Sequence, residues 1–259
     1  MTNQALIFFD IDGTLLDHDK NLPSTTKSAI NQLQSDGHII AIATGRGPFM
    51  YEGLRQELNI DTFVSFNGSY VVLEDKVIYT HPLNKQKLLE LTQEGLVNDQ
   101  PSVYMSENEL RSNVEHHNFV EESIATLKLD VTAKFDPDYA LNRDIYQVLF
   151  YINEDETTYY QENYSEFEFV RWHPLSVDVV PQGGSKAKGI HLLVDELNIR
   201  PENVYAFGDG LNDVEMLQSV KNSVAMGNGV PEAKAAAKYT TKDVDQDGLV
   251  EGLKMTGLL

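Results

Sequence analysis

The chain has 259 residues, and its 40 acidic and 20 basic side chains give a formal net charge of −20. A hydrophobic content of 41% is enough for a folded core, so the composition excludes an intrinsically disordered protein. The acidic excess also argues against a nucleic-acid partner, because binding to the phosphate backbone needs clustered lysine and arginine.

The sequence also indicates the cellular compartment of the protein. No apolar run approaches the ~18–20 residues that a membrane span requires, and the first residues lack the features of a signal peptide. The absence of cysteine excludes disulfides and thiolate metal sites. We therefore expect a cytoplasmic protein that has no membrane contact and is a monomer or homodimer.

The first 83 residues alternate between short apolar segments and amphipathic segments. This alternation is typical of βαβ units around a parallel sheet. Ser24 or Thr25 is expected to cap the first helix, and a hairpin is expected to turn at Glu74–Lys76. The predicted strands span residues 5–9, 38–43 and 62–66, the helices 24–37 and 47–59, and the hairpin 69–80.

Residues 84–182 have a different pattern, in which aromatic and acidic residues concentrate and strands alternate as antiparallel, half-exposed strands do. Helices are predicted at residues 85–97 and 117–128, and strands at 102–106, 145–152, 167–173 and 176–181. We interpret this stretch as an inserted α+β domain.

After residue 183 the βαβ pattern returns. Helices are predicted at residues 185–198, 211–220 and 230–238, and strands at 204–209 and 222–226. Residues 1–83 and 183–259 are therefore expected to share one doubly wound, Rossmann-like parallel sheet. The predicted fold class is α/β, with an inserted α+β domain.

Four polar groups occur where predicted strands end or predicted helices begin. Ligands of open parallel sheets bind outside the carboxyl ends of the strands, so these groups are the candidate site. They are Asp10 with Asp12, Thr44–Gly45–Arg46, Lys186, and Asp209 with Asn212 and Asp213.

Asp10 and Asp12 open a short motif that has two simpler explanations. A calcium loop of the EF-hand type needs glycine at its sixth position and glutamate at its twelfth, but here glycine is fourth and the twelfth residue is Asn21. A solvated turn at the end of a strand stays open, since aspartate and glycine are common in turns. The motif alone does not decide between a turn and a site.

Asp209 and Asp213 add acids at a second strand end. Carboxylates near a helix start can serve as caps. Four acids at two ends of one sheet, however, form an oxygen-rich site suited to Mg²⁺. Zinc is disfavoured, because cysteine and paired-histidine motifs are lacking.

Two other groups fit a phosphate anion. Thr44 offers a hydroxyl group and is expected to lead into a helix whose N-terminal N–H groups attract anions. Lys186 supplies a positive charge near the start of another helix. Its preceding glycines do not form a P-loop, because the GxxxxGK[ST] spacing is absent, and a flexible linker explains them equally well when they are considered alone.

The four groups, taken in order, resemble the four motifs of the haloacid dehalogenase superfamily of phosphotransferases. Three further segments are similar to its Cof-type sugar-phosphatase subfamily: SFNGS at residues 65–69, VDVVPQGGSK at 177–186 and AMGNG at 225–229. This resemblance implies an α/β cap domain between the second and third motifs, at residues 84–182. It also implies a small phosphorylated metabolite as substrate.

The resemblance implies a role for each site residue. Asp10 is the expected nucleophile, and Asp12 the general acid and base. The expected Mg²⁺ ligands are Asp10, the backbone carbonyl of Asp12, and Asp209, with Asp213 supporting or joining them. The expected phosphate-binding residues are Thr44, Gly45, Arg46, Lys186 and Asn212.

Two questions stay open at this point. Arg46 is expected either to bind the substrate phosphate or to pair with the surrounding acids. An acid at Asp12 favours hydrolysis over ion pumping, since pumps of this superfamily tend to carry threonine there. The predicted function is a Mg²⁺-dependent phosphatase, and the alternatives are a phosphomutase of the same fold or a non-catalytic protein that binds a phosphorylated metabolite.

Overall fold

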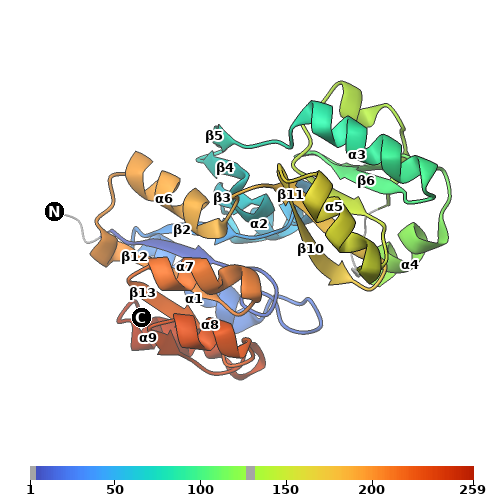
Figure 1. Ribbon diagram of the computed structural model, residues 1–259. Helices are drawn as coiled ribbons and strands as arrows, with labels where there is room; N and C mark the ends of the chain where they lie inside the picture. Colours follow the sequence, from blue (N-terminus) through green and yellow to red (C-terminus); the bar gives the residue numbers. More distant parts are fainter. Residues whose placement is uncertain (1–3, 127–131) are drawn as a thin grey trace. The chain divides into compact units, whose positions relative to one another are not determined.

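The computed structural model describes residues 4–126 and 132–259 (Figure 1). The chain divides into two compact units. The first comprises Met1–Arg46, Glu52–Tyr79 and Ser185–Leu259, and the second comprises Gly47–Tyr51 and Thr80–Gly184. The second unit contains the predicted inserted domain and also residues 47–51, 80–83 and 183–184, which the sequence pattern assigned to the first.

The first unit is built on an eight-stranded sheet with the strand order β14-β13-β12-β1-β2-β3-β4-β5. The strands from β14 to β3 pair in parallel, and β4 pairs antiparallel to β3. The strands are β1 (Leu6–Phe9), β2 (Ile39–Ala43), β3 (Thr62–Ser65), β4 (Tyr70–Leu73), β5 (Lys76–Thr80), β12 (Val204–Gly208), β13 (Asn222–Ala225) and β14 (Tyr239–Thr240).

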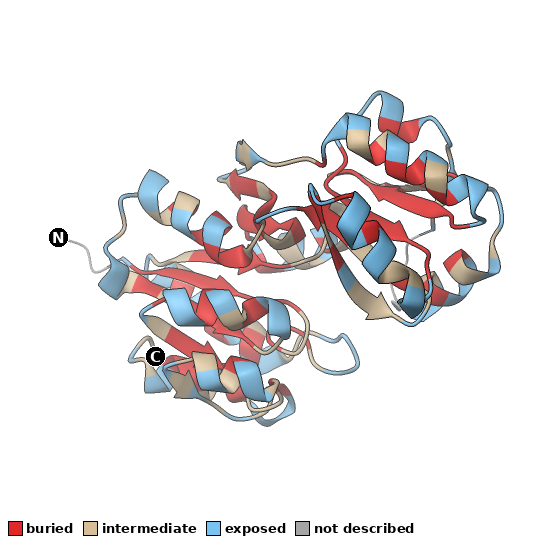
Figure 2. Ribbon diagram, viewed as in Figure 1, coloured by how far each residue is buried: buried red, intermediate tan, exposed pale blue. Residues whose placement is uncertain are grey.

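Helices cover both faces of this sheet (Figure 1). On one face α6 contacts β3 and β4, and α7 contacts β12 and β13, while α1 contacts α9 on the other. The central strands β1, β2, β3 and β12 are almost wholly buried, as both-sided covering requires, whereas the edge strand β5 is largely exposed (Figure 2). The helices are α1 (Ser24–Ser35), α2 (Glu52–Leu58), α6 (Lys186–Glu196), α7 (Val214–Ser219), α8 (Pro231–Ala236) and α9 (Gly248–Met255). The predicted doubly wound α/β fold is confirmed.

The second unit has a six-stranded sheet with the order β10-β11-β9-β6-β7-β8. Its pairs are antiparallel except for β7 with β8. The strands are β6 (Ser102–Met105), β7 (Leu110–Ser112), β8 (Lys134–Phe135), β9 (Gln147–Phe150), β10 (Phe167–His173) and β11 (Ser176–Pro181). Its helices are α3 (Lys85–Val97), α4 (Asn118–Thr126) and α5 (Thr157–Asn163).

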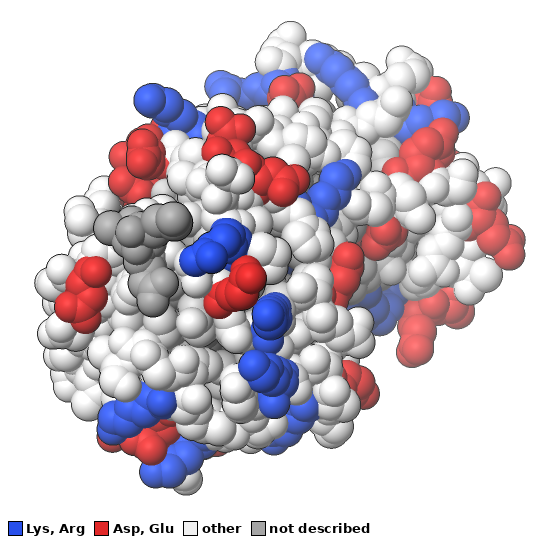
Figure 3. All heavy atoms as spheres, turned by 90° about the vertical axis from the view of Figure 1, so that its left-hand side faces the viewer, with Lys and Arg blue, Asp and Glu red and all other residues white. Residues whose placement is uncertain are grey.

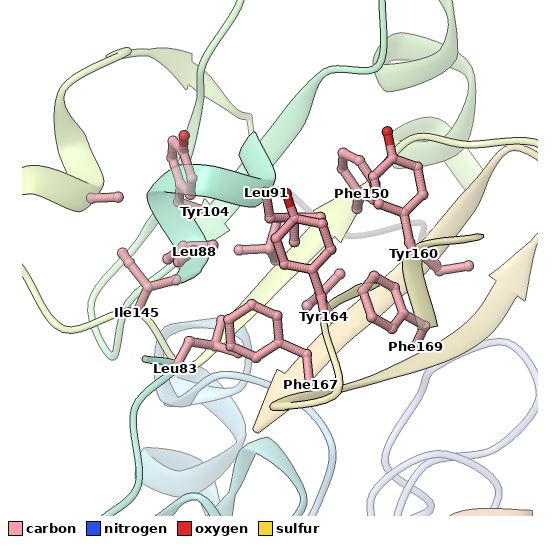
Figure 4. Close-up of a cluster of buried hydrophobic side chains, with 14 of the residues drawn as sticks. Leu83, Leu88, Leu91, Tyr104, Ile145, Phe150, Tyr160, Tyr164, Phe167 and Phe169 are labelled. Atoms are coloured by element: carbon pink, nitrogen blue, oxygen red, sulfur yellow. The ribbon is translucent and has the colours of Figure 1, made fainter. Parts of the chain in front are cut away.

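An aromatic core joins helices α3 and α5 to this second sheet (Figure 4). Tyr160 of α5 is 1% exposed and packs edge to face against Phe150 of β9, with ring centroids 4.8 Å apart. Leu88 and Leu91 of α3 belong to the same buried cluster. The second unit therefore has a hydrophobic core of its own.

Several local predictions are wrong. Pro23 occupies the N-cap position of α1 without a side-chain hydrogen bond, and the hydroxyl of Thr25 instead donates to Asp247 at 2.7 Å. The predicted helix at 47–59 is a 3₁₀ turn, Pro48–Met50, followed by α2. The predicted helix at 211–220 likewise splits into a 3₁₀ turn and α7.

Five short elements were not predicted, namely β7, β8, β14, α5 and α9. The last residues of the predicted helix at 117–128 lie outside the described part of the chain. No described helix is long and apolar enough to cross a membrane.

Candidate active site

A buried lysine lies between two carboxylates at the carboxyl edge of the first sheet. Lys186, the first residue of α6, is positioned by Ser185, whose side chain accepts a hydrogen bond from the backbone N–H of Lys188. Its Nζ atom lies 2.5 Å from Oδ1 of Asp10 and 2.7 Å from Oδ1 of Asp213. The side chains of Lys186 and Asp213 are fully buried, and that of Asp10 is 10% exposed.

The same burial explains the ionisation of these groups. Burial raises the pKa of Asp10 to about 7; Lys186 opposes this shift, whereas Asp213 and Asp209 add to it. For Lys186, burial favours the neutral amine, but the two carboxylates outweigh it and raise the pKa. The lysine is therefore a permanent cation, and the carboxylates around it are crowded.

Asp209 brings a third carboxylate to this group from the end of β12. Its Oδ1 atom accepts a hydrogen bond from the hydroxyl of Thr14, with the oxygens 3.2 Å apart. Burial and the nearby Asp213 raise the pKa of Asp209 to about 6. Asn228 donates both to Oδ2 of Asp209, at 3.3 Å, and to the backbone carbonyl of Gly13, at 2.8 Å.

The turn after β1 brings its backbone close to these acids. Gly13 has a φ of +76°, and a Cβ atom there would lie 2.4 Å from Oδ2 of Asp209. Only glycine meets both conditions, the left-handed backbone and the close approach. The close approach of Asp209 therefore explains why glycine occupies position 13.

Asp12 has a different environment from Asp10. The guanidinium group of Arg46 binds it through two hydrogen bonds, from Nε to Oδ2 at 2.8 Å and from Nη2 to Oδ1 at 2.6 Å. Lys20 adds a third, from Nζ to Oδ1 at 2.5 Å. Burial alone would raise the pKa of Asp12, but the two cations outweigh it and lower the pKa. Of the two roles expected for Arg46, the structure shows the pairing with an acid.

Thr44 follows β2 and is almost fully buried. Its Oγ1 atom accepts a hydrogen bond from the backbone N–H of Arg46 at 3.2 Å, which leaves the hydroxyl hydrogen free to be donated. The expected helix N-terminus is not built as predicted, because the next turn begins at Pro48, which has no N–H.

Asn212 lies next to the loop that follows Thr44. Its Nδ2 atom donates to Oδ1 of Asn67 at 3.2 Å. A Cβ atom on Gly45 would lie 3.5 Å from this same nitrogen, so Gly45 and Asn212 are neighbours. Residues from the ends of β2, β3 and β12 thus meet at one edge of the sheet.

The donor set fits a divalent cation. Oxygen atoms of Asp10, Asp209 and Asp213 all lie within 4.8 Å of one another. Burial raises the pKa values of Asp10 and Asp209, and the neighbouring carboxylate of Asp213 adds to both shifts. Oδ2 of Asp213 accepts the backbone N–H groups of Asp209 and Gly210, at 2.9 and 2.8 Å, so this residue also fixes the loop. Carboxylate oxygens are the ligands that Mg²⁺ prefers.

The charges at this edge differ from those on the exterior. On the face drawn in Figure 3, basic and acidic side chains are interspersed. At the site, by contrast, the acids gather at low exposure around Lys186. The electrostatic field at the site is therefore determined mainly by Lys186 and the acids around it.

Sequence reasoning missed three residues of this site. Asn67 follows β3 and Asn228 follows β13, so each comes after a strand end, the signal that located the other groups. Lys20 follows no strand end, and nothing in the sequence pattern singled it out.

Comparisons with known proteins identify the family of the chain. A family model described as haloacid dehalogenase-like hydrolase matches residues 7–253. The chain is 44% identical over 257 residues to a Bacillus subtilis (strain 168) protein named "Putative phosphatase YkrA", with 99% of each chain covered.

Two solved structures are also similar. The crystal structure of a hypothetical protein from Geobacillus kaustophilus HTA426 is 48% identical, with a TM-score of 0.96 over 99% of this chain and 100% of that one. The structure of BT4131, described as a subclass IIB sugar phosphatase, is 29% identical, with a TM-score of 0.84 over 99% and 100%. The resemblance found in the sequence is confirmed, and the chain belongs to the haloacid dehalogenase-like hydrolases.

Proposed function

We propose that the chain is a Mg²⁺-dependent phosphatase that hydrolyses a small phosphomonoester through an aspartyl-phosphate on Asp10. The observation that carries this proposal is the buried lysine held 2.5 Å from Asp10 and 2.7 Å from Asp213, with Asp209 beside them. A carboxylate fixed in this way has a defined orientation, which nucleophilic attack requires.

In the first proposed step, a carboxylate oxygen of Asp10 attacks phosphorus and the bond from phosphorus to the leaving oxygen breaks. Asp12 must be protonated for this step, and it gives that proton to the leaving oxygen, so that a neutral alcohol leaves. In the second step, Asp12 takes a proton from water as the water attacks phosphorus. The bond from phosphorus to Asp10 then breaks, and inorganic phosphate is released.

The proposed metal ligands are Asp10, the backbone carbonyl of Asp12, and Asp209. Asp213 supports them through its hydrogen bonds to the Asp209 loop and its contact with Lys186. When bound, Mg²⁺ supplies positive charge that screens the repulsion between the phosphate dianion and the carboxylate nucleophile.

The proposed phosphate ligands are the residues that surround Asp10. The hydroxyl of Thr44 is available as a donor, and Lys186 contributes a fixed positive charge. Gly45 and Asn212 are proposed because they are neighbours beside Thr44. Arg46 is proposed as a further phosphate ligand because its guanidinium group lies beside Asp12, which serves the leaving oxygen in the proposed reaction.

The proposed substrate class is a sugar phosphate or a similar metabolite, which the likeness to the sugar phosphatase BT4131 supports. A phosphomutase needs the same acids and differs in transferring the phosphoryl group to a second hydroxyl. A protein that only binds the metabolite needs no nucleophile, and no observation favours it over the main proposal. Location in the cytoplasm and a monomeric or homodimeric state stay predictions, which cell fractionation and light scattering test.

The test is release of inorganic phosphate from p-nitrophenyl phosphate and from a panel of sugar phosphates, with Mg²⁺ and with EDTA. We expect turnover with Mg²⁺ alone, and none for Asp10→Asn. Asp36→Asn, an equal change at an exposed acid at the end of α1, is the matched control and should behave as the wild type. Equal rates for the wild type and Asp10→Asn on every compound would contradict the proposal, and phosphoryl transfer without phosphate release would favour the mutase.

A further inference from the structure

We propose that Lys20 is a further substrate-binding residue, whose ammonium group moves from Asp12 to the phosphoryl group of the substrate. The inference rests on the proposed function of the same site. Lys20 lies outside the four motifs that located the other residues, and it enters the site only through the fold of its loop.

The loop that carries Lys20 is held in shape by Asp17. The Oδ1 atom of Asp17 accepts the backbone N–H groups of Asp19, at 2.9 Å, and Asn21, at 2.8 Å. The backbone N–H of Lys20 donates to the carbonyl oxygen of Asp17 at 3.0 Å. Lys20 itself has a φ of 66°, a left-handed conformation that is uncommon for residues other than glycine. The loop thus maintains an unfavourable backbone that directs this lysine to the site.

The position of Lys20 places it beside the reacting atoms of the proposed mechanism. Its Nζ atom is 2.5 Å from Oδ1 of Asp12, the group that serves the leaving oxygen. Any atom that hydrogen-bonds to that oxygen lies within about 5.5 Å of the ammonium group. Rotation of the flexible four-carbon stem covers such a distance.

Of the described cations at the site, Lys20 is the one most easily moved. Lys186 is fully buried and is bound by two carboxylates. The side chain of Arg46 is 14% exposed and holds Asp12 through two hydrogen bonds. Lys20 is 37% exposed and makes one hydrogen bond to Asp12, and exposed ion pairs contribute little stability.

Electrostatic attraction favours movement of Lys20 from Asp12 to the substrate phosphate. An incoming phosphate dianion carries more negative charge than the single carboxylate of Asp12, and it offers more acceptor oxygens. In an acidic protein, a local cation is needed to attract such an anion. We therefore expect Lys20 to contribute to the binding of phosphate itself, whatever the leaving group.

The test compares Lys20→Met, Lys20→Gln and Lys20→Arg in the presence of Mg²⁺. It measures kcat and KM for p-nitrophenyl phosphate and the inhibition constant of inorganic phosphate. Lys27→Met is the matched control, because Lys27 is 42% exposed and forms one ion pair, 2.8 Å from Glu57. Melting curves of each variant verify folding.

We expect Lys20→Met and Lys20→Gln to raise both KM and the phosphate inhibition constant about fivefold, with kcat changed less than about twofold. Lys20→Arg should recover most of the loss, and Lys27→Met should match the wild type. The inference is overturned if Lys20→Gln restores wild-type constants, since glutamine keeps a hydrogen bond to Asp12 without the charge. It is also overturned if kcat alone falls. A wild type without phosphatase activity would instead refute the proposed function.

Discussion

Replacing the buried lysine is the most direct test of the site's electrostatics. Lys186→Met keeps the apolar stem but removes the charge between Asp10 and Asp213, which are 10% and 0% exposed. The side chain makes two charge-assisted hydrogen bonds, and each is worth about 1.5–3 kcal/mol. Removing one partner of a buried ion pair typically costs about 3–5 kcal/mol, which agrees with the combined value of the two hydrogen bonds.

The assay is urea unfolding followed by far-UV circular dichroism at pH 8 in EDTA. With a slope of about 2 kcal/mol/M, a loss of 3–5 kcal/mol lowers the urea midpoint by about 1.5–2.5 M. Lys188→Met is the matched control, because Lys188 lies in the same helix and is exposed. A midpoint for Lys186→Met within about 0.3 M of that control would refute the reasoning.

The pH dependence gives this prediction a second, independent readout. When folding raises the pKa of a carboxyl group, that group destabilises the folded state. The destabilisation grows as the pH rises from the pKa of the group in the unfolded state to its pKa in the folded state. Burial raises the pKa of Asp10 to about 7, and loss of Lys186 removes an influence that opposes this shift. The cost of Lys186→Met should therefore be smaller at pH 5, where Asp10 is protonated, than at pH 8. An equal cost at both values would mean that the carboxylates are not the cause.

Three other changes test separate parts of the site. Asn228→Ala removes the hydrogen bond to the proposed metal ligand Asp209 and the one to the backbone carbonyl of Gly13, and should weaken Mg²⁺ activation about tenfold in a titration of phosphatase rate. Arg46→Met should raise the pKa of Asp12, so the limb of the kcat/KM profile that Asp12 sets moves to higher pH; an unmoved profile argues against that pairing. Gly68→Ala places a Cβ atom 2.0 Å from a backbone oxygen at the start of α6, so its melting temperature should fall far more than that of Gly37→Ala, which has a similar φ but open space.

The structure brings together the candidate residues that follow buried parallel strands, as the sequence pattern predicted. Asp10, Thr44 and Asp209 follow β1, β2 and β12, and parallel pairing of these strands brings their carboxyl ends together. The same rule extended to β3 and β13 locates Asn67 and Asn228. Asn212 was predicted because it belongs to the motif of Asp209 and Asp213, whereas Asn67 and Asn228 have no acid beside them in the sequence.

Other features depend on contacts that periodicity does not record. Strands β8 and β14 have two residues each, too few for an alternating pattern. Helix α5 has a polar, tyrosine-rich sequence and is stabilised by the burial of Tyr160 in the second core. The position of Lys20 results from a loop closed by hydrogen bonds to Asp17, and Pro23 rather than a serine or threonine occupies the N-cap position of α1.

The balance of charge at the site connects these observations to the proposed reaction. The site has four carboxylates and three cations. The carboxylates belong to Asp10, Asp12, Asp209 and Asp213, and the cations to Lys20, Arg46 and Lys186. When all seven groups are ionised, the net charge is −1, which would repel a phosphate dianion. A bound Mg²⁺ ion changes this sum to +1. In the proposed mechanism the metal therefore contributes to substrate binding as well as to chemistry, and the loss of Lys20 would return the sum to zero. This is why a lysine outside the four motifs should affect the affinity for phosphate while the nucleophile stays intact.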